Sequence, residues 1–180
     1  MCGWLVELVI ATTFWQGPLS PRPKLAVPIT VPHHLTRIGI YYSSNQQTKA
    51  IGDLVSIAFY FLLRVGEYTH SQSDERRRTQ RFRIKDIILR NAAGVILPNC
   101  DNAALLSTAT HATLKITNQK NGTRGQCISL DCDGTDTSPV KAIVRRILHI
   151  THHTKHRKDS QNFPISTFWH DPETPGVIKP

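Results

Sequence analysis

The sequence predicts an α+β fold that is mainly α-helical and carries a small antiparallel sheet. Apolar residues recur at helical spacing in residues 48–68 and 139–152, whereas residues 82–89 and 113–130 are rich in β-branched side chains. A length of 180 residues with 39% hydrophobic content suits one domain with a packed core. We expect that domain over residues 35–153.

The amino-terminal residues 1–34 are expected to precede the domain. Residues 1–15 are apolar, but they lack a basic start, include Glu7 and show no small-residue cleavage site of the kind that ends a signal peptide. Residues 16–34 are rich in proline, which favours an extended connector. We therefore expect an intracellular protein that is not secreted.

The first predicted element of the domain is a central helix. Thr48 is a suitable N-cap for a helix that runs to about Tyr68 and is apolar on nearly all sides. Such a helix belongs in a core, where burying one large aliphatic side chain contributes roughly 1.5–3 kcal/mol. Its apolar run is too short to span a bilayer, so we expect no membrane segment. Residues 35–45 have room for a short helix that docks on it.

Strands are predicted after a polar loop at 69–79. Residues 82–89 form the first strand, residues 95–97 have the composition to pair with it, and residues 99–110 carry little signal. In the hairpin at 113–130, apolar residues face one another if the strands pair in the following register, with Asn-Gly in the turn. The expected pairs are Leu114 with Leu130, Ile116 with Ile128, and Lys120 with Arg124.

The last predicted element is an amphipathic helix. Ser138 and Pro139 are a favourable N-cap and first helical residue, and apolar residues then follow one face to about His152. Lys141, Arg145 and Arg146 lie off that face. Residues 154–180 are basic and then interrupted by prolines, and we expect them to form a tail.

The charge of the chain favours a polyanionic partner. Lys and Arg number 22 against 13 acidic residues, which gives a net charge of +9 and a pI near 9.7. Basic residues gather at 76–90 and at 141–158, on either side of the hairpin, and this clustering points to nucleic acid. A charge run is otherwise most often a solvated face. The residues that we expect to contact DNA are Arg81, Arg83, Lys85, Arg124, Arg145 and Arg146.

Arg64 stands within the apolar run at 57–68. A guanidinium keeps its proton in proteins, so an arginine in such a segment needs an anion, a paired carboxylate or a route to water. Glu67 lies one helical turn away and could satisfy it as a purely structural ion pair. The alternative is that Arg64 binds a phosphate group.

The order of these motifs resembles the first half of a tyrosine recombinase catalytic domain, the DNA breaking-rejoining fold of phage integrases. The stretch FYFLLRVGEY at residues 59–68 is similar to the box of eukaryotic recombinase-like proteins that reads Phe-Tyr-Leu-Leu-Arg-Val-Gly-Glu-Tyr. The resemblance implies that Arg64 binds the scissile phosphate, supported by Glu67, and that Lys120 protonates the leaving oxygen. These roles suit a planar guanidinium and a proton-carrying ammonium.

The other half of the family pattern is missing from this sequence. No His-x-x-Arg follows Lys120, and no tyrosine follows Tyr68 to act as the nucleophile. We therefore expect a truncated or degenerate domain of DNA recombination or integration, of the kind that mobile elements carry. The resemblance implies DNA strand breaking and rejoining, but we expect this chain alone to bind DNA without a cofactor and without cutting it. We also expect an uncovered hydrophobic surface that promotes self-association.

Two other functions compete with this hypothesis. One is a nonspecific basic nucleic-acid-binding module whose Arg76-Arg77-Arg78 run serves nuclear import or phosphate contact. The other is a zinc site on the helix end, because four histidines there fall at helical spacing and two cysteines precede them. No Cys-x-x-Cys pair accompanies these residues, so we expect no metal. They are His149, His152, His153, His156, Cys127 and Cys132.

Overall fold

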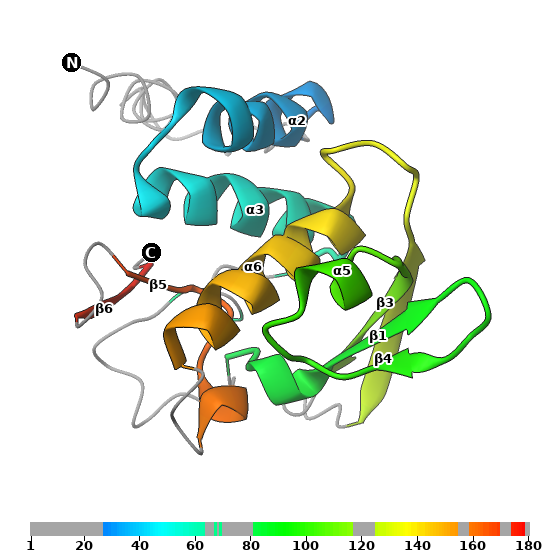
Figure 1. Ribbon diagram of the computed structural model, residues 1–180. Coiled ribbons are helices and arrows are strands. Elements are labelled where there is room, and N and C mark those ends of the chain that lie inside the picture. The colour runs from blue at the N-terminus through cyan, green and yellow to red at the C-terminus, as the bar shows by residue number, and fades with distance from the viewer. Residues whose placement is uncertain are drawn as a thin grey trace, which may run out of the picture.

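The computed structural model describes residues 27–63, 67, 69, 81–116, 125–154, 159–169 and 174–178. A four-stranded antiparallel sheet forms one layer of the molecule, and helices stack against one of its faces (Figure 1). The prediction of an α+β fold with a small antiparallel sheet is confirmed. Within the described residues, no helix combines the length and hydropathy needed to cross a bilayer.

Helix α2 (Thr30–Arg37) starts inside the segment predicted as a connector and continues into a π-helical turn, η1 (Ile38–Tyr42). Pro32 is tolerated because it lies in the first turn, where a backbone N–H has no partner within the helix. Helix α2 packs closely on the next helix at Gly52, where a Cβ atom would lie 2.8 Å from the carbonyl oxygen of Leu35. Thr36 Oγ1 donates to the carbonyl of Gly52 over 2.9 Å.

The central helix, α3 (Gln46–Tyr60), begins and ends earlier than predicted. Asn45 is the N-cap instead of Thr48, because its Oδ1 accepts the N–H of Gln47 at 2.7 Å. At the other end, the N–H of Leu63 bonds the carbonyl of Ala58 at 2.9 Å, while Leu62 takes a left-handed φ of 54°. This is a Schellman cap with leucine at the position that usually holds glycine.

The sheet has the order β2-β1-β3-β4. Leu89 on β1 lies opposite Leu97 on β2, which confirms the predicted pairing of residues 95–97. Residues 84–86 form a 3-10 turn, so the first strand is shorter than predicted, and residues 99–110 contain a short helix. The elements are η3 (Ile84–Asp86), β1 (Ile87–Asn91), β2 (Ile96–Leu97), α5 (Ala103–Leu106), β3 (Ala109–Ile116) and β4 (Gln126–Asp131).

The register of the β3–β4 hairpin differs from the predicted one. Leu114 lies opposite Ile128, and Ile116 lies opposite Gln126. The predicted register, with Leu114 opposite Leu130, is therefore wrong by two residues. A shift of two keeps every side chain on its own face of the sheet, so the apolar pattern fits both registers.

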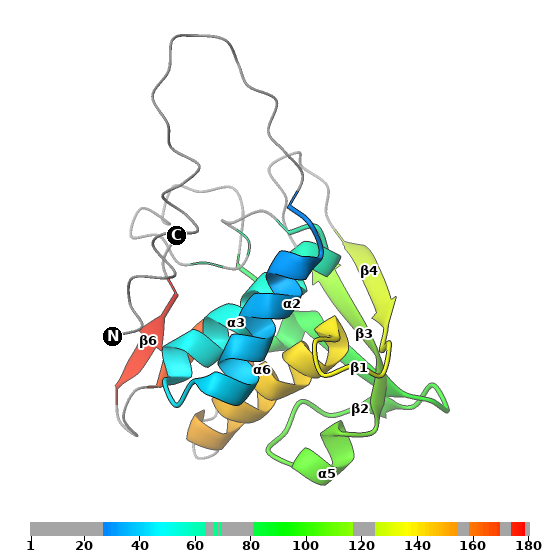
Figure 2. The same ribbon diagram turned by 90° about the horizontal axis from the view of Figure 1, so that it is seen from above.

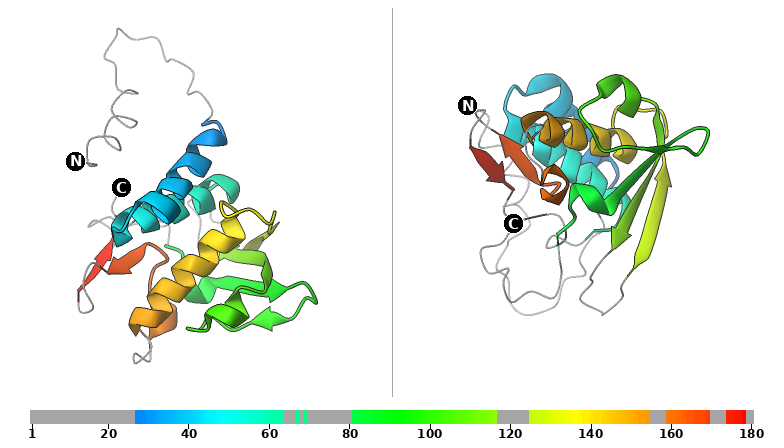
Figure 3. Two further views of the ribbon diagram at one scale, coloured as in Figure 1. Left: turned by 45° about the horizontal axis from the view of Figure 1, so that its top comes forward. Right: turned by 60° about the horizontal axis from the view of Figure 1, so that its bottom comes forward.

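Helix α6 (Pro139–Thr154) follows the predicted helix closely and lies between the sheet and α3. Figure 2 shows α2 lying across α3, and Figure 3 shows the helices on a single side of the sheet. Ile143 and Ile147 of α6 join Leu54 of α3 and Leu114 of β3 in one buried cluster. The main core is therefore the space that the sheet, α6 and α3 enclose.

The carboxyl-terminal segment is part of the fold where the structure describes it. A 3-10 turn, η4 (Ser160–Asn162), leads to a two-stranded hairpin of β5 (Thr167–Trp169) and β6 (Pro175–Val177). Trp169 packs with Ile84 and Ile150 in a second buried cluster. The expectation that residues 154–180 form a tail is therefore wrong for these described residues.

Candidate nucleic-acid interface

The two residues predicted to handle the phosphate, Arg64 and Lys120, lie outside the described residues, as does Arg124. The predicted pairing of Lys120 with Arg124 falls there as well. Leu63 directly precedes Arg64, and Ile116 is the last described residue before Lys120. Leu63 packs against the core cluster that contains Ile116. The chain therefore enters both segments from the same hydrophobic core.

Glu67, the residue predicted to support Arg64, is enclosed by the fold. Its exposed fraction is 4%, and its backbone carbonyl accepts the N–H of Phe82 at 3.0 Å. A buried carboxylate is costly unless it is paired or hydrogen-bonded. The burial of Glu67 is thus consistent with a structural or supporting role, and it argues against direct contact with DNA.

The backbone of the basic segment at 81–85 is hydrogen-bonded to residues 163–165. Phe82 contributes its carbonyl to the N–H of Ile165 at 3.0 Å, and Ile84 donates to the carbonyl of Phe163 at 3.2 Å. Lys85 is exposed and donates from Nζ to Oδ1 of Asn162 at 2.9 Å. Arg81 and Arg83 are half-buried, so all three predicted DNA contacts in this segment retain surface.

The face of the sheet that points away from α6 carries a polar row. Arg90 donates from Nη1 to Oγ1 of Thr113 at 3.2 Å, and that oxygen lies 2.8 Å from Oγ of Ser129. Lys115, two residues beyond Thr113 on the same face, is exposed. Sequence reasoning did not single out this row. The sequence pattern that could have indicated this row is the alternation of Thr113 and Lys115 with buried apolar residues along β3.

Arg145 is committed to a structural ion pair. Its Nε and Nη2 lie 2.8 Å and 2.6 Å from Oδ1 of Asp53 on α3, and its Nη1 donates to the carbonyl of Asp136 at 3.0 Å. Burial raises the pKa of Asp53 above its ordinary value, and the guanidinium of Arg145 opposes that rise. All three guanidinium nitrogens are thus engaged within the protein, whereas the side chain keeps 31% of its exposure, so DNA contact by Arg145 stays a prediction.

Arg146 is also structural. Its side chain is 2% exposed, Nε donates to the carbonyl of Ile165 at 3.1 Å, and Nη2 donates to the carbonyl of Thr167. Burial lowers the pKa of Arg146 to about 10, which still leaves it charged at neutral pH. These two hydrogen bonds link the β5 segment to α6. The expectation that Arg146 contacts DNA is therefore wrong.

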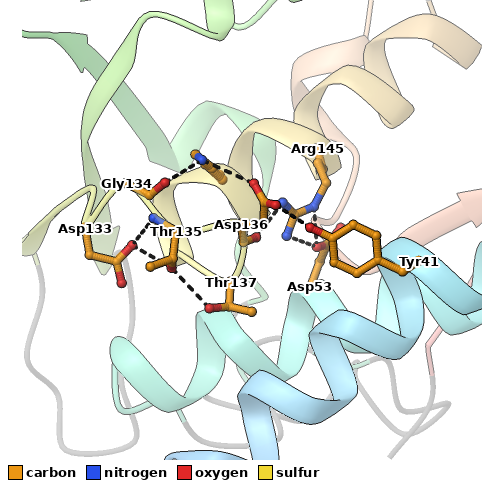
Figure 4. Close-up of polar contacts among 9 residues, drawn as sticks. Tyr41, Asp53, Asp133, Gly134, Thr135, Asp136, Thr137 and Arg145 are labelled. Carbon is orange, nitrogen blue, oxygen red and sulfur yellow. Dashed lines mark hydrogen bonds and ion pairs between the residues drawn. The ribbon is translucent and has the colours of Figure 1, made fainter.

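A polar network positions the beginning of α6 (Figure 4). Asp136 accepts a hydrogen bond from the hydroxyl of Tyr41 on η1, and its Oδ1 lies 3.3 Å from Nζ of Lys141. Lys141 also donates to the carbonyl of Gly134 at 2.8 Å. The bond from Tyr41 lowers the pKa of Asp136 and raises that of Tyr41. Sequence reasoning missed this network because Tyr41 lies 95 residues before Asp136 in the chain.

Two histidines at the end of α6, His149 and His153, pack against an aromatic ring. His153 stacks on Trp169 with ring centroids 4.9 Å apart, and His149 lies edge-on to the same indole. Burial, followed by the nearby Arg146, lowers the pKa of His149 to about 3. Among the described residues, no group of three or more His, Cys, Asp or Glu side chains is arranged to hold a metal ion. His156 lies outside them.

No protein-family model, curated protein or solved structure matches the chain. The comparisons therefore neither support nor oppose the resemblance to tyrosine recombinases.

Proposed function

We propose that the chain is a DNA-binding domain of the tyrosine recombinase class that holds DNA without cutting it. The observation that carries this proposal is the box at 59–68, in which Arg64 follows an apolar run and precedes Val-Gly-Glu. A planar guanidinium is suited to bind a pair of phosphate oxygens. The described elements support the proposal, because a helix, a strand and a hairpin follow in the order that the resemblance implies.

The distribution of charge also supports a DNA partner. Arg145 and Arg146 serve the interior, but Arg81, Arg83 and Lys85 keep surface, and more than half of the 22 Lys and Arg belong to residues outside the described ones. Those segments include residues 76–78, 120–124 and 155–158. We propose that they supply most of the phosphate contacts, which would make binding strongly dependent on salt.

The rival function, a nonspecific basic module, is separated from this one by two matched variants. Arg64→Ala and Arg77→Ala each remove one positive charge. Affinity for a short mixed-sequence duplex would be measured over a range of salt concentrations. A phosphate clamp predicts that Arg64→Ala weakens binding well beyond Arg77→Ala, whereas a nonspecific module predicts equal losses and an equal fall in the salt slope. Equal losses would contradict the proposal.

The proposed lack of strand cleavage has its own test. A tyrosine recombinase needs a nucleophile that becomes covalently joined to DNA, and this chain has no tyrosine after Tyr68. We expect no protein–DNA adduct when the chain is incubated with supercoiled plasmid. A nicked plasmid bearing covalently attached protein would show that another residue supplies the nucleophile.

We also propose that the chain associates with itself through exposed apolar side chains. Leu62 and Tyr42 are 87% and 83% exposed, and Val95 and Ile96 also present large apolar surface. Such side chains favour association when they form a continuous patch. Size-exclusion chromatography with light scattering over a range of protein concentrations tests this, and a monomer at all concentrations would contradict it.

A further inference from the structure

A small cavity lies between η1, α3 and α6. Its volume is about 190 Å³, and its walls include Gln46, Lys49, Asp53, Arg145, Arg146 and His149. Pockets for drug-sized ligands usually measure about 300–1,000 Å³. This cavity has room for about six water molecules at ~30 Å³ each, which is enough for a small inorganic ion together with part of its hydration water.

Positive charge exceeds negative charge around this cavity. Lys49, Arg145 and Arg146 contribute three cations, whereas Asp53 is the single carboxylate among the described lining residues. Asp53 is already bound to Arg145 at 2.6 Å. Arg146 is fully buried and bonds only neutral carbonyls, so its charge is compensated incompletely. Protonation of Asp53 would remove its negative charge and so enlarge the excess of positive charge around the cavity.

Buried positive charge that lacks a carboxylate partner is energetically costly, and a bound anion would relieve that cost. His149 can contribute a neutral donor to such an anion. Its Nε2 accepts the backbone N–H of Trp169 at 3.3 Å, so the ring proton resides on Nδ1. Nδ1 has no hydrogen-bond partner among the described residues. The low pKa of His149 keeps the ring neutral at physiological pH.

We propose that this cavity binds a tetrahedral inorganic oxyanion, with phosphate as the physiological candidate. Lys49 and Arg146 supply charge, and His149 and Gln46 supply neutral donors. The cavity does not depend on the DNA-binding proposal, because none of these residues belongs to the segments proposed to contact DNA. Failure of either proposal leaves the other intact.

The test is a titration of the full chain with sodium phosphate at pH 7.5, against sodium chloride of the same ionic strength. Isothermal titration calorimetry should show saturable 1:1 binding, and the melting temperature should rise with phosphate and not with chloride. We expect a dissociation constant of about 1 mM or tighter. The absence of saturable phosphate binding would overturn the proposal.

Two lysine variants locate the bound ion. Lys49→Gln removes a cation from the cavity wall and should weaken phosphate binding by about tenfold or more, because charge-assisted hydrogen bonds are lost. Lys115→Gln removes the same charge from the far side of the sheet and should leave phosphate binding unchanged. Each variant is compared with its own melting temperature in chloride, so a change in basal stability does not affect the result. Equal weakening by both variants would contradict a site at this cavity.

A third experiment distinguishes a site for a free phosphate ion from a site for the phosphate groups of a nucleic acid. Duplex DNA is added at a saturating concentration, and the phosphate titration is repeated. Unchanged phosphate affinity supports a site for a free oxyanion. Complete displacement of phosphate by the duplex would overturn that assignment.

Discussion

Arg145 on α6 and Asp53 on α3 form an ion pair in which two guanidinium nitrogens lie 2.8 Å and 2.6 Å from the same carboxylate oxygen. Asp53 is almost completely buried, whereas Arg145 retains about a third of its exposure. The pair therefore joins the two main helices at the edge of the core. Its strength depends on both partners, since either one alone would leave a charge without compensation.

The first prediction concerns this ion pair. Asp53→Asn removes the carboxylate charge and should lower the free energy of unfolding by about 3 kcal/mol, the loss expected when one partner of a buried pair is removed. Urea denaturation followed by circular dichroism measures the change. Asp136→Asn, which removes an exposed carboxylate from the neighbouring network, is the control and should cost much less. Similar losses in the two variants would show that the buried pair contributes little.

The second prediction concerns Arg146, which sequence reasoning had placed on the DNA surface. Arg146→Met should destabilise the protein by about 2–4 kcal/mol, because the carbonyls of Ile165 and Thr167 lose their donors. The affinity for DNA is measured under conditions where the variant is folded. It should fall only by the small amount expected when one positive charge distant from the DNA is removed. A large loss of DNA affinity with unchanged stability would restore Arg146 to the interface.

The third prediction concerns the end of α3. Leu62 has a φ of 54°, a conformation that costs a residue with a Cβ atom roughly 1–2 kcal/mol, and its side chain is 87% exposed. Leu62→Gly should therefore stabilise the protein by up to about 1 kcal/mol after the entropy of glycine in the unfolded chain is included. Leu62→Ala is the control, because it removes the side chain and keeps the backbone strain. Destabilisation by Leu62→Gly would contradict the capped end of α3.

The fourth prediction concerns pH. The folded pKa of His149, about 3, lies below the ordinary histidine value of 6.5, so between these values the unfolded chain binds more protons than the folded one. Stability should fall as the pH is lowered from 6.5 toward 3. Burial is the main cause that lowers the pKa of His149, and the charges of Arg146, His153, His152 and Lys49 lower it further.

Melting temperatures of wild type and His149→Gln between pH 7.5 and pH 4 test this dependence. The variant should lose a clear part of the acid sensitivity, because its side chain does not titrate. His34→Gln, a replacement of an exposed histidine on α2, is the control and should behave as wild type. Identical acid sensitivity in wild type and His149→Gln would show that protonation of His149 does not cause the loss of stability at low pH.

Sequence periodicity predicted the elements more reliably than their ends. Helix α6 was predictable because Pro139 is a favourable first residue and its apolar face is regular, although the Ser138 hydroxyl makes no capping bond. The end of α3 was not, because the chain stops the helix with a left-handed Leu62 in place of the usual glycine. An apolar run therefore continued the predicted helix past the residue where the backbone turns.

The roles of the charged residues were the least predictable part of the site. Arg145 and Arg146 lie off the apolar face of α6, which usually indicates solvent. Helix α6 is instead covered on more than one side, by the sheet, by α3 and by β5. The partners that bury these arginines, such as Asp53 and the carbonyl of Ile165, are distant in the chain, so no local pattern could reveal them.

The most direct test of the proposed function is a nuclear magnetic resonance titration of the isotopically labelled 180-residue chain with a short DNA duplex. A recombinase-like phosphate clamp predicts that the perturbed backbone amides gather near Leu63, Glu67, Ile116 and Gly125, which flank Arg64 and Lys120, and along residues 81–85. Amides of α5 should be unaffected. Perturbations confined to other surfaces, with the amides around Arg64 and Lys120 unchanged at saturation, would contradict the account.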